Sequence, residues 1–531
     1  MKTSFEVKRA LAPLGANDIS SNFGAKIWPV FFLFCVGSMF RVYNFWAPGL
    51  WIDEYGTWWV VTGTSWTEVA QRAIKIQGQS PFYYLIVKLF TDLAGYSAFV
   101  LRLPSILFGI ATLALVYPLA LSLFDNHRVA ILSLGIFATS EQLIWYSQNA
   151  RPYSLALFLS LLSFWFLLSL LRDEKITYRL GYGLTATLLV YAHFLYGFAL
   201  IIQVIYLLFE LGWRRLANKK WLITFALIGL LLLPLTGQLV DLFGRRQHLN
   251  WIPAMPWFHP IVAGINFALG SFHPVTIVAT VLAVVAIGFD WKKLGQRKVM
   301  ALLKLPVMWS ALPFVSFIIF AKLFGIVLFD TRYLLFGYPA VYFLMAWFMS
   351  NLKRNHFRQW IPPLVFLITT LARTSLPALI NGDMFSYWTK WEWADAASVI
   401  ANSYQAGDII VLRTGLIEAN QAVVENDNQN LTSYVNWALL ANLIPPRDYK
   451  ILMLPFVLNE TTRTYFASAD KTISSHRRVW LVGEGEVITM VRDKLILDSQ
   501  YRLVYQPIRG RVQLFLLEKE AAPSRSRRLS P

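Results

Sequence analysis

Two adjacent carboxylates, Asp53 and Glu54, lie in the aromatic-rich stretch APGLWIDEYGTWW, directly after the first long apolar run of the sequence. A carboxylate beside an apolar surface is costly unless it is paired or used in function. The pair is therefore a candidate for catalysis, and the alternative is that both acids are solvated in a loop. An ionised carboxylate in this position can act as a general base that takes the proton from a hydroxyl group.

Cationic side chains stand near the ends of several other apolar runs. They are Arg102 in LRLPS, Arg151 in YSQNARPY, His193 in YAHF and Arg332 in FDTRY, with Lys322 about three turns before Arg332. Several fixed cations together with one acidic pair suit an anionic phosphate ligand and a single general base. For each arginine or lysine, the alternative is an anchor that extends its charged end to the membrane interface.

Composition points to a membrane as the solvent of this chain. Of its 531 residues, 56% are hydrophobic and only 15% are charged, which is more apolar than a soluble domain of this size. The net charge of +18 would suit nucleic acid, but the basic residues fall mainly in short loops between apolar runs, as in membrane proteins. The single cysteine, Cys35, excludes an internal disulfide. We expect a polytopic membrane protein with no nucleic-acid partner.

About eleven apolar runs approach the length that crosses a hydrocarbon core of about 30 Å. The predicted transmembrane helices are 27–46, 100–124, 128–145, 153–171, 179–194, 195–211, 221–240, 272–289, 305–328, 333–350 and 359–379. The segment 81–95 is apolar but short, and it carries Lys88 and Asp92. We therefore predict a re-entrant or interfacial helix there.

Basic residues segregate between the two sets of alternating loops when 81–95 is not counted as a span. One set holds 20 Lys and Arg residues and the other holds nine. Because Lys and Arg are enriched in cytoplasmic loops, we expect a cytoplasmic N-terminus in a multi-pass protein of the inner (plasma) membrane. Everything after residue 380 is then extracytoplasmic, and the candidate residues lie at the outer face.

The sequence divides into four predicted parts. They are a cytoplasmic tail (1–26), a transmembrane domain (27–380) with a first outer loop (47–99), a soluble extracytoplasmic α/β domain (381–521) and a disordered tail (522–531). Within the α/β domain, the patterns predict helices near 391–404 and 484–497, strands at 408–413 and 479–483, and a hairpin over 501–518.

The order of several motifs resembles a known superfamily. W-x-D-E follows the first span, and Q-S-P-F-Y-Y, L-R-x-P-S, Y-S-x-x-x-R-P-Y and a late R-Y come after it. This order is similar to that of the bacterial members of the protein O-mannosyltransferase superfamily, GT-C glycosyltransferases that include the aminoarabinose transferases acting on lipid A. The resemblance covers about residues 27–350 and implies a GT-C-like helical membrane domain.

The resemblance implies an inverting transfer of a sugar from a polyprenyl-phosphate donor to an acceptor hydroxyl. Asp53 is the expected base, Glu54 is expected to support the site, and Arg151 and Arg332 are expected near the donor phosphate. Fixed cations would stabilise the negative charge that the phosphate gains as it leaves. The expected substrate pocket holds Tyr83, Tyr84, Tyr153, His193 and Tyr333.

One departure from the pattern of these relatives affects the phosphate contacts. Gln79 and Ser80 stand where relatives often have His or Lys followed by Pro, so one cationic contact is missing. Lys75 or Lys322 could replace it, and Arg102 is a further expected phosphate contact.

A second departure affects metal binding. Asn149 stands where relatives often carry an acid two residues before the arginine of the second loop. One carboxylate pair with His193 is a thin ligand set for a divalent cation. We expect no required metal and no other cofactor.

Two other functions compete with glycosyl transfer. A transporter or flippase of a lipid-linked or polar substrate would also be polytopic, but it would be expected to show inverted repeats and polar residues at mid-membrane. A membrane anchor that displays the C-terminal domain needs far fewer than eleven spans. The expected partners are a polyprenyl-phosphate sugar, membrane lipid and an acceptor, which is a glycan, a lipid or a protein.

Overall fold

The chain folds as two compact units in the computed structural model. The first comprises Met1–Ala47, Ser65–Ile74 and Gly78–Phe385, and the second comprises Pro48–Thr64, Lys75–Gln77 and Ser386–Pro531. Part of the predicted first outer loop therefore folds with the C-terminal domain. The structure describes residues 23–43, 49–244, 259–269, 272–287, 296–324, 330–352, 360–375, 393–425, 428–457, 460–498, 501–506 and 512–519. The first 22 residues of the predicted N-terminal tail and the predicted tail 522–531 lie outside these ranges.

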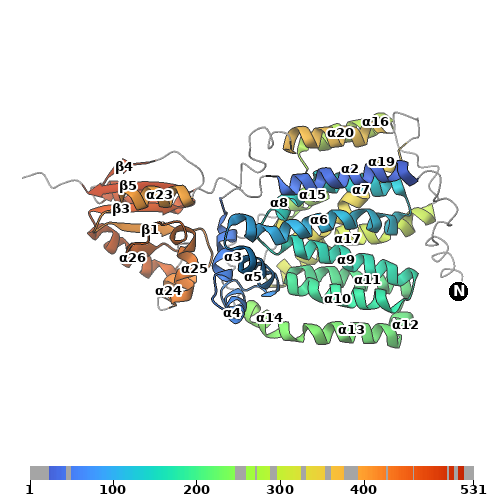
Figure 1. Cartoon of the computed structure of the whole chain (residues 1–531), viewed down its shortest axis with the longest axis horizontal. Helices are drawn as coiled ribbons and strands as arrows, with labels where there is room; N and C mark the ends of the chain where they lie inside the picture. The colour runs from blue at the N-terminus through green and yellow to red at the C-terminus, as the bar shows by residue number, and fades with distance from the viewer. Residues whose placement is uncertain are drawn as a thin grey trace, which may run out of the picture. The chain divides into compact units, whose positions relative to one another are not determined.

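The first unit is helical throughout its described part. Its elements are α2 (Phe23–Val42), α4 (Trp66–Lys75), α5 (Phe82–Ala94), α6 (Ala98–Phe124), α7 (His127–Thr139), α8 (Glu141–Ser147), α9 (Tyr153–Arg172), α10 (Ile176–Ala192), η2 (Phe194–Gly197), α11 (Phe198–Leu211), α12 (Trp213–Leu216), α13 (Lys219–Leu232), η3 (Leu233–Leu235), α14 (Thr236–Gly244), α15 (His259–Ala268), α16 (Pro274–Ile287), α17 (Gln296–Phe324), α18 (Thr331–Leu334), η6 (Leu335–Gly337), α19 (Tyr338–Ser350), α20 (Ile361–Thr370) and η8 (Leu371–Ser375). Helix α9 packs between α6 and α10 at the centre of the bundle (Figure 1).

Six described helical segments are long and apolar enough to cross a membrane. They are Ala98–Phe124, Tyr153–Arg172, Phe194–Leu211, Lys219–Leu242, Val299–Phe324 and Thr331–Ser350. The bent pair α7–α8 adds a seventh if it counts as one span, and Ile27–Val42, Pro274–Ile287 and Ile361–Arg373 are shorter apolar helices. The chain is an integral membrane protein, but the predicted number of eleven spans stays a prediction.

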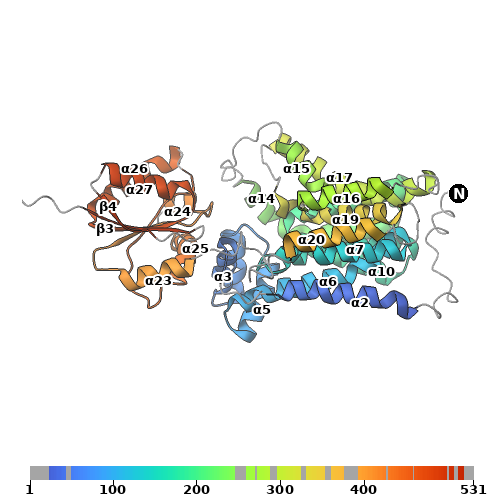
Figure 2. The same cartoon turned by 90° about the horizontal axis from the view of Figure 1, so that it is seen from above.

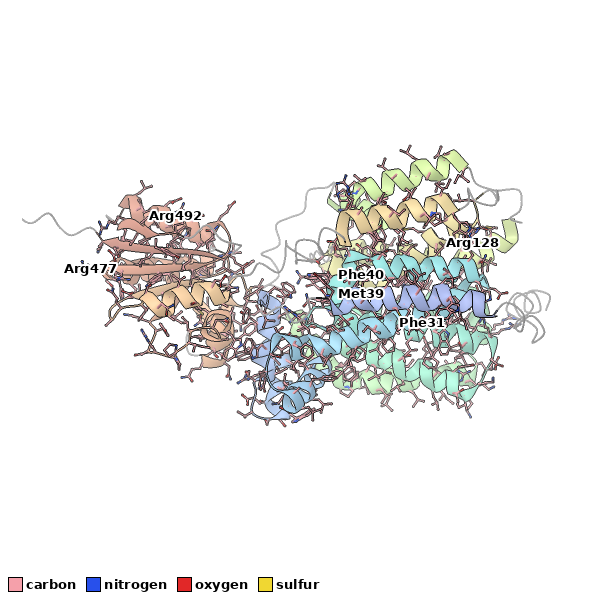
Figure 3. The ribbon with its side chains drawn as sticks, turned by 45° about the horizontal axis from the view of Figure 1, so that its top comes forward. Phe31, Met39, Phe40, Arg128, Arg477 and Arg492 are labelled. Carbon is pink, nitrogen blue, oxygen red and sulfur yellow. The ribbon has the colours of Figure 1, made fainter. Side chains whose placement is uncertain are left out.

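Apolar side chains on the outside of the bundle fit a lipid environment. Phe31 and Met39 are more than half exposed on α2 (Figure 3), whereas the neighbouring Phe40 is buried against Ile144. In water such exposure would be unfavourable, but hydrocarbon solvates these side chains. The same helix therefore presents one face to lipid and the other to the protein.

Helix α5 is too short to cross the bilayer, as predicted for the segment 81–95. Its 13 residues span about 20 Å at 1.5 Å per residue. Lys88 Nζ pairs with Asp92 one turn later at 2.7 Å and donates to Tyr96 Oη at 3.3 Å. These partners satisfy the charge of a lysine that is almost fully buried.

The predicted span 128–145 is two helices, α7 and α8, that meet at an angle of 61°. Ser140 between them has an extended backbone, and its Oγ accepts from the Leu143 backbone N–H, which begins α8. The break leaves the last carbonyls of α7 without helical partners. Arg41 from α2 donates to one of them, the Phe137 carbonyl, at 3.1 Å.

The C-terminus of α2 is capped in return by Gln148, which follows α8. Its Nε2 is shared among the carbonyl oxygens of Phe40, Arg41 and Tyr43 at 3.0, 3.2 and 2.7 Å. One amide group therefore serves three carbonyl oxygens at the end of α2 with its two N–H donors.

Replacing Gln148 with leucine is expected to lower the free energy of unfolding by about 1–3 kcal/mol, because buried carbonyls lose their donor. Thermal unfolding of the purified protein in detergent would measure the change. Gln142→Leu on α8 is the matched control, since the buried Gln142 Oε1 has no hydrogen-bond partner among the described residues. Equal destabilisation by the two variants would contradict this account of Gln148.

The second unit is built on a five-stranded mixed sheet. Its strands are β1 (Ile409–Arg413), β2 (Ile451–Met453), β3 (Arg478–Gly483), β4 (Tyr501–Tyr505) and β5 (Gln513–Lys519), in the order β2-β1-β3-β5-β4. Strand β1 pairs parallel with β2 and β3, and β5 pairs antiparallel with β3 and β4. The helices are α3 (Ile52–Val61), α23 (Trp393–Ser403), α24 (Ala419–Val424), α25 (Gln429–Leu440), α26 (Glu460–Ser475) and α27 (Glu486–Asp498).

Alternate residues of the central strands fill two apolar layers, because strand side chains point to opposite faces. Val411, Leu481 and Phe515 form a core with apolar residues of α26 and α27, and Figure 2 shows α23 on the opposite face of the sheet. The intervening residues Leu412 and Trp480 are also buried. Burial on both faces explains the continuous apolar runs that predicted β1 and β3.

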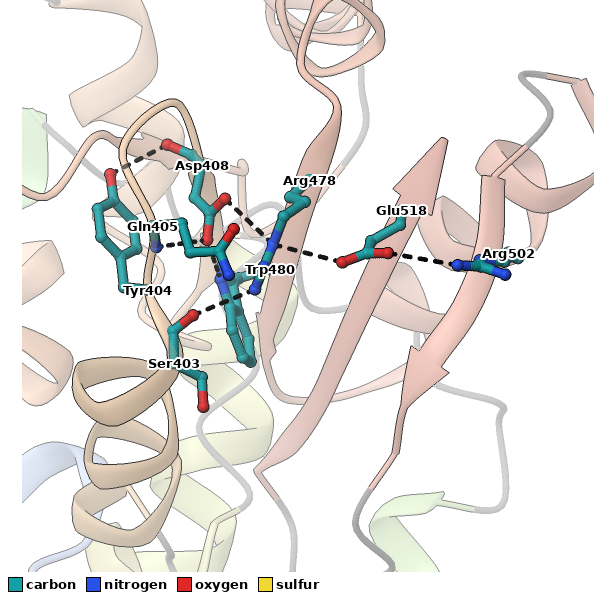
Figure 4. A network of polar contacts seen from close by, with 8 residues as sticks. All are labelled: Ser403, Tyr404, Gln405, Asp408, Arg478, Trp480, Arg502 and Glu518. Carbon is teal, nitrogen blue, oxygen red and sulfur yellow. Dashed lines mark hydrogen bonds and ion pairs between the residues drawn. The ribbon is translucent and has the colours of Figure 1, made fainter. Parts of the chain in front are cut away.

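A polar network fastens one end of this sheet (Figure 4). The buried Asp408, which precedes β1, accepts from Trp480 Nε1 at 2.9 Å and pairs with Arg478 Nε at 3.3 Å. Arg478 also pairs with Glu518, and Glu518 pairs with Arg502, at 3.6 and 3.7 Å. The network links β1, β3, β5 and β4, and we interpret it as structural.

Candidate active site

The turn between α8 and α9 holds Arg151 in a buried position of the first unit. Its guanidinium donates to Tyr84 Oη on α5 at 3.2 Å, and its backbone carbonyl accepts from Ser105 Oγ on α6 at 3.1 Å. Ser105 is also hydrogen-bonded to Tyr83 Oη at 2.8 Å. Arg151, Tyr83 and Tyr84 are all less than 10% exposed. Two helices thus fix both the backbone and the charge of this arginine.

His193 lies where α10 ends, and three tyrosine rings surround it. Its ring centroid is 5.7 Å from that of Tyr153, 5.0 Å from Tyr196 and 6.1 Å from Tyr333. The side chain is 4% exposed, and its Nδ1 has no hydrogen-bond partner in the part of the chain that the structure describes. A buried polar atom of this kind calls for a partner such as water or a ligand.

Arg332 is the second residue of the short helix α18 and brings a second cation close to His193. It pairs with Asp330 at 3.0 Å, and its backbone carbonyl accepts from Tyr196 Oη at 3.1 Å. Its guanidinium lies over the Tyr333 ring at 5.4 Å from the centroid. Tyr153 and Tyr333, which lie beside the His193 ring, follow Arg151 by two residues and Arg332 by one. Two cations from distant parts of the sequence therefore converge on one buried histidine.

Asp53 and Glu54 belong to the second unit, where they occupy the first turn of α3. The Glu54 carboxylate accepts from the Trp51 backbone N–H at 3.3 Å and is almost fully buried. Such a contact caps the helix, and the positive end of the helix dipole favours both acids. Asp53 is half-buried, and its backbone carbonyl accepts from Thr57 Oγ1 at 3.4 Å. The two neighbouring acids therefore have different surroundings.

Comparison with known proteins connects the helical part of the chain to glycosyl transfer. Residues 78–236 match the family model described as dolichyl-phosphate-mannose-protein mannosyltransferase. Two solved structures are similar: ArnT from Cupriavidus metallidurans in the apo state, and the same protein bound to undecaprenyl phosphate. Each is 13% identical, with TM-scores of 0.51 and 0.52, and each match covers 94% of this chain and 98% of that chain. The chain therefore shares the fold of ArnT, and its residues 78–236 are similar to the mannosyltransferase family. No curated protein sequence matches it.

The region matched by the family model contains most of the candidate residues. Tyr83, Tyr84, Arg151, Tyr153 and His193 fall within residues 78–236, whereas the acidic pair and Arg332 lie outside it. The GT-C fold predicted from the motif order is confirmed by the solved structures. The roles of single residues stay predictions.

Two further residues are predicted phosphate contacts, and they differ in burial. Arg102 is buried on α6, one turn before Ser105. Lys322 is exposed near the end of α17, and no contact among the described residues joins it to the cluster around His193. Exposure of this kind suits the alternative of an interface anchor.

Four residues of the cluster did not emerge from the sequence. Ser105 donates to the backbone carbonyl of Arg151, and Tyr196 donates to that of Arg332. Asp330 pairs with Arg332. The Tyr146 ring packs on the Tyr153 ring at 5.2 Å between centroids. Ser105 and Tyr146 stand inside the quoted motifs LRLPS and YSQNARPY, and Asp330 stands inside FDTRY. Tyr196 carries no sequence signal of this kind. Among the described residues, no three His, Cys, Asp or Glu side chains could hold a metal ion together, and metal independence stays a prediction.

Proposed function

We propose that this protein is a membrane glycosyltransferase that moves a sugar from a polyprenyl-phosphate donor to an acceptor hydroxyl, with inversion, at the outer face of the cytoplasmic membrane. The family model concerns sugar transfer from dolichyl phosphate to protein. The similar ArnT structure contains undecaprenyl phosphate, which is also a polyprenyl phosphate. These likenesses support the class of donor, and the cluster in the first unit supports the chemistry.

The grouping of Arg151 and Arg332 around the buried His193 is the observation that carries the proposal. Tyr153, two residues after Arg151, and Tyr333, next to Arg332, both lie beside the His193 ring. A polyprenyl phosphate gains negative charge as the bond from its oxygen to the sugar breaks. Cations that are already fixed in a water-poor site stabilise that charge without reorganisation. Arg151 is fixed by Tyr84 and Ser105, and its planar guanidinium can donate two parallel hydrogen bonds to phosphate.

We assign the general base to Asp53, on the W-x-D-E motif and on its half-buried position in α3. In the proposed step, Asp53 takes the acceptor hydroxyl proton while the acceptor oxygen forms a bond to the anomeric carbon. The bond between that carbon and the phosphate oxygen breaks, and the polyprenyl phosphate leaves with the electron pair. Attack opposite the leaving group inverts the anomeric centre. Glu54 supports the site by capping α3, and the step includes no metal.

Reconstitution of the purified protein in lipid tests the proposal. A set of radiolabelled polyprenyl-phosphate sugars is offered together with a total envelope extract as the source of acceptors. We expect one donor to lose its label to a glycan, lipid or protein, and the labelled product identifies the acceptor. Label that crosses sealed vesicles while still on the polyprenyl carrier would support a flippase and overturn the proposal.

A further inference from the structure

Helix α3, which carries Asp53, is bound by residues almost 400 positions later in the chain. Trp59 Nε1 donates to Ser433 Oγ on α25 at 3.1 Å, and Tyr55 Oη accepts from Asn442 Nδ2, just after α25, at 2.8 Å. The Trp59 ring also packs against the edge of Tyr434 at 5.2 Å between centroids. Tyr55 and Trp59 are at most 3% exposed. We call this contact, Tyr55–Trp59 with Ser433–Asn442, the α3–α25 contact.

The next segment of the first loop joins the same contact. Gln77 Nε2 donates to Tyr434 Oη at 3.0 Å. Gly56 lies beneath both side chains, and a β-carbon there would stand 2.5 Å from Gln77 Nε2 and 3.2 Å from Tyr434 Oη. Only glycine permits this approach without displacement of a neighbour. Both parts of the first loop in this unit are thus held by one tyrosine of α25.

Hydrogen bonds at this contact fix the rotation of α3 about its own axis. An apolar contact alone would allow small rotations, whereas hydrogen bonds weaken steeply when their angles change. At about 100° per residue, Asp53 lies about 160° around the helix from Tyr55 and about 120° from Trp59. The α3–α25 contact therefore holds one face of α3, and Asp53 lies on another face of the same helix.

Helix α25 is itself part of the α/β domain core. Leu431, Val435 and Leu439 are buried along it, it packs against α23 and α24, and Asn428 caps its start by accepting from the Leu431 backbone N–H at 3.1 Å. The place of α3 within this unit is therefore set by a folded domain and not by the loop alone.

We infer that Ser433, Tyr434 and Asn442 are positioning residues for the transfer reaction, which they affect by setting the orientation of α3 and hence of Asp53. The inference rests on the proposed function. A displacement of a catalytic group by about 1 Å can reduce a rate by about 10²-fold. The C-terminal domain is then required for the chemical step itself.

The double variant Ser433→Ala/Asn442→Ala in the full chain tests the inference, because it leaves the sequence of α3 unchanged and removes two of its partners. Amide hydrogen exchange of residues 52–61 is expected to accelerate by about tenfold or more as these two hydrogen bonds are lost. We expect kcat for transfer to fall by about 10–100-fold with the KM of the donor unchanged. Asn442→Gln, which keeps an amide donor, is expected to recover part of the loss that Asn442→Ala causes alone.

Tyr465→Phe is the matched control in the same unit. This substitution on α26 removes the hydrogen bond of 2.7 Å from Tyr465 Oη to the Met453 carbonyl of β2. It is expected to change neither hydrogen exchange nor kcat. Unchanged exchange of residues 52–61 in the double variant would overturn the inference. So would faster exchange with wild-type kcat, or an equal fall of kcat in the control.

The transfer assay and the hydrogen-exchange measurement distinguish failure of the proposed function from failure of the α3–α25 contact to order α3. If the wild type transferred no sugar, the proposed function and the positioning role would both be overturned. The exchange measurement needs no substrate, so it would still show whether α25 orders α3.

Discussion

Replacement of Asp53 with asparagine is expected to reduce kcat for sugar transfer by about 10²–10⁴-fold, the usual contribution of a general base. Asparagine has nearly the same shape as aspartate but cannot take the proton of the acceptor hydroxyl. Because the side chain is half-buried in the first turn of α3, the substitution is expected to leave the thermal midpoint close to that of the wild type. Initial rates with labelled donor and thermal unfolding in detergent would measure the two effects.

Glu54→Gln is the matched control for this prediction. The glutamine side-chain oxygen can still accept from the Trp51 backbone N–H, as the Glu54 carboxylate does at 3.3 Å. We therefore expect most of the activity to be kept. Wild-type activity in the Asp53→Asn variant would show that Asp53 is not the base, and inactivity of Glu54→Gln alone would transfer that role to Glu54.

The difference between the two acids illustrates what could be predicted from the sequence. The motif W-x-D-E identified both as candidates, and the resemblance to known relatives assigned the base to Asp53, but no pattern showed what Glu54 does. A helix start at Ile52 places Glu54 at the third helical position, where its side chain can reach back to the Trp51 N–H. That distinction depends on the residue at which the helix begins, and element boundaries are the least certain part of a sequence-based prediction.

Long apolar runs predicted the helices because a segment that lipid surrounds must have apolar side chains. The continuous apolar stretches of β1 and β3 were recognised for a similar reason, since both faces of these strands are buried. The break at Ser140 was missed, since a serine in an apolar run carries little signal when its partners, such as Tyr342 Oη at 2.9 Å, are distant in sequence. Strand β2 was missed because it has three residues. Helices α24, α25 and α26 were not predicted either, and their apolar positions alternate with many polar ones.

No sequence pattern predicted that part of the first loop folds with the C-terminal domain. The hydrogen bond from Trp59 to Ser433 joins residues 374 positions apart. No local pattern specifies such a pair, because each partner alone is an ordinary aromatic or hydroxyl side chain. The same holds for Tyr196, which reaches the Arg332 carbonyl across 136 positions. Local periodicity predicted the elements, and only the folded structure showed which side chains meet.

Replacement of Arg151 with methionine is expected to reduce kcat by about 10²–10³-fold, as when one fixed donor to a developing negative charge is removed. Methionine fills a similar volume, so the buried site keeps its packing. Arg151→Lys keeps the charge but loses the planar fork and is expected to be intermediate. If Arg151 acts mainly in the transition state, kcat and kcat/KM should fall together while the KM of the donor stays constant.

The two arginines are expected to differ, and their order gives a sharper test than either variant alone. The Arg332 side chain is 32% exposed and pairs with Asp330 at 3.0 Å, so water and the carboxylate already screen its charge. Arg151 is 7% exposed and donates to the neutral Tyr84 hydroxyl. Arg332→Met should therefore cost less activity than Arg151→Met, and Tyr84→Phe should cost least because it leaves the charge in place. The reverse order of the two arginines would place the leaving phosphate near Arg332 and contradict the role given to Arg151.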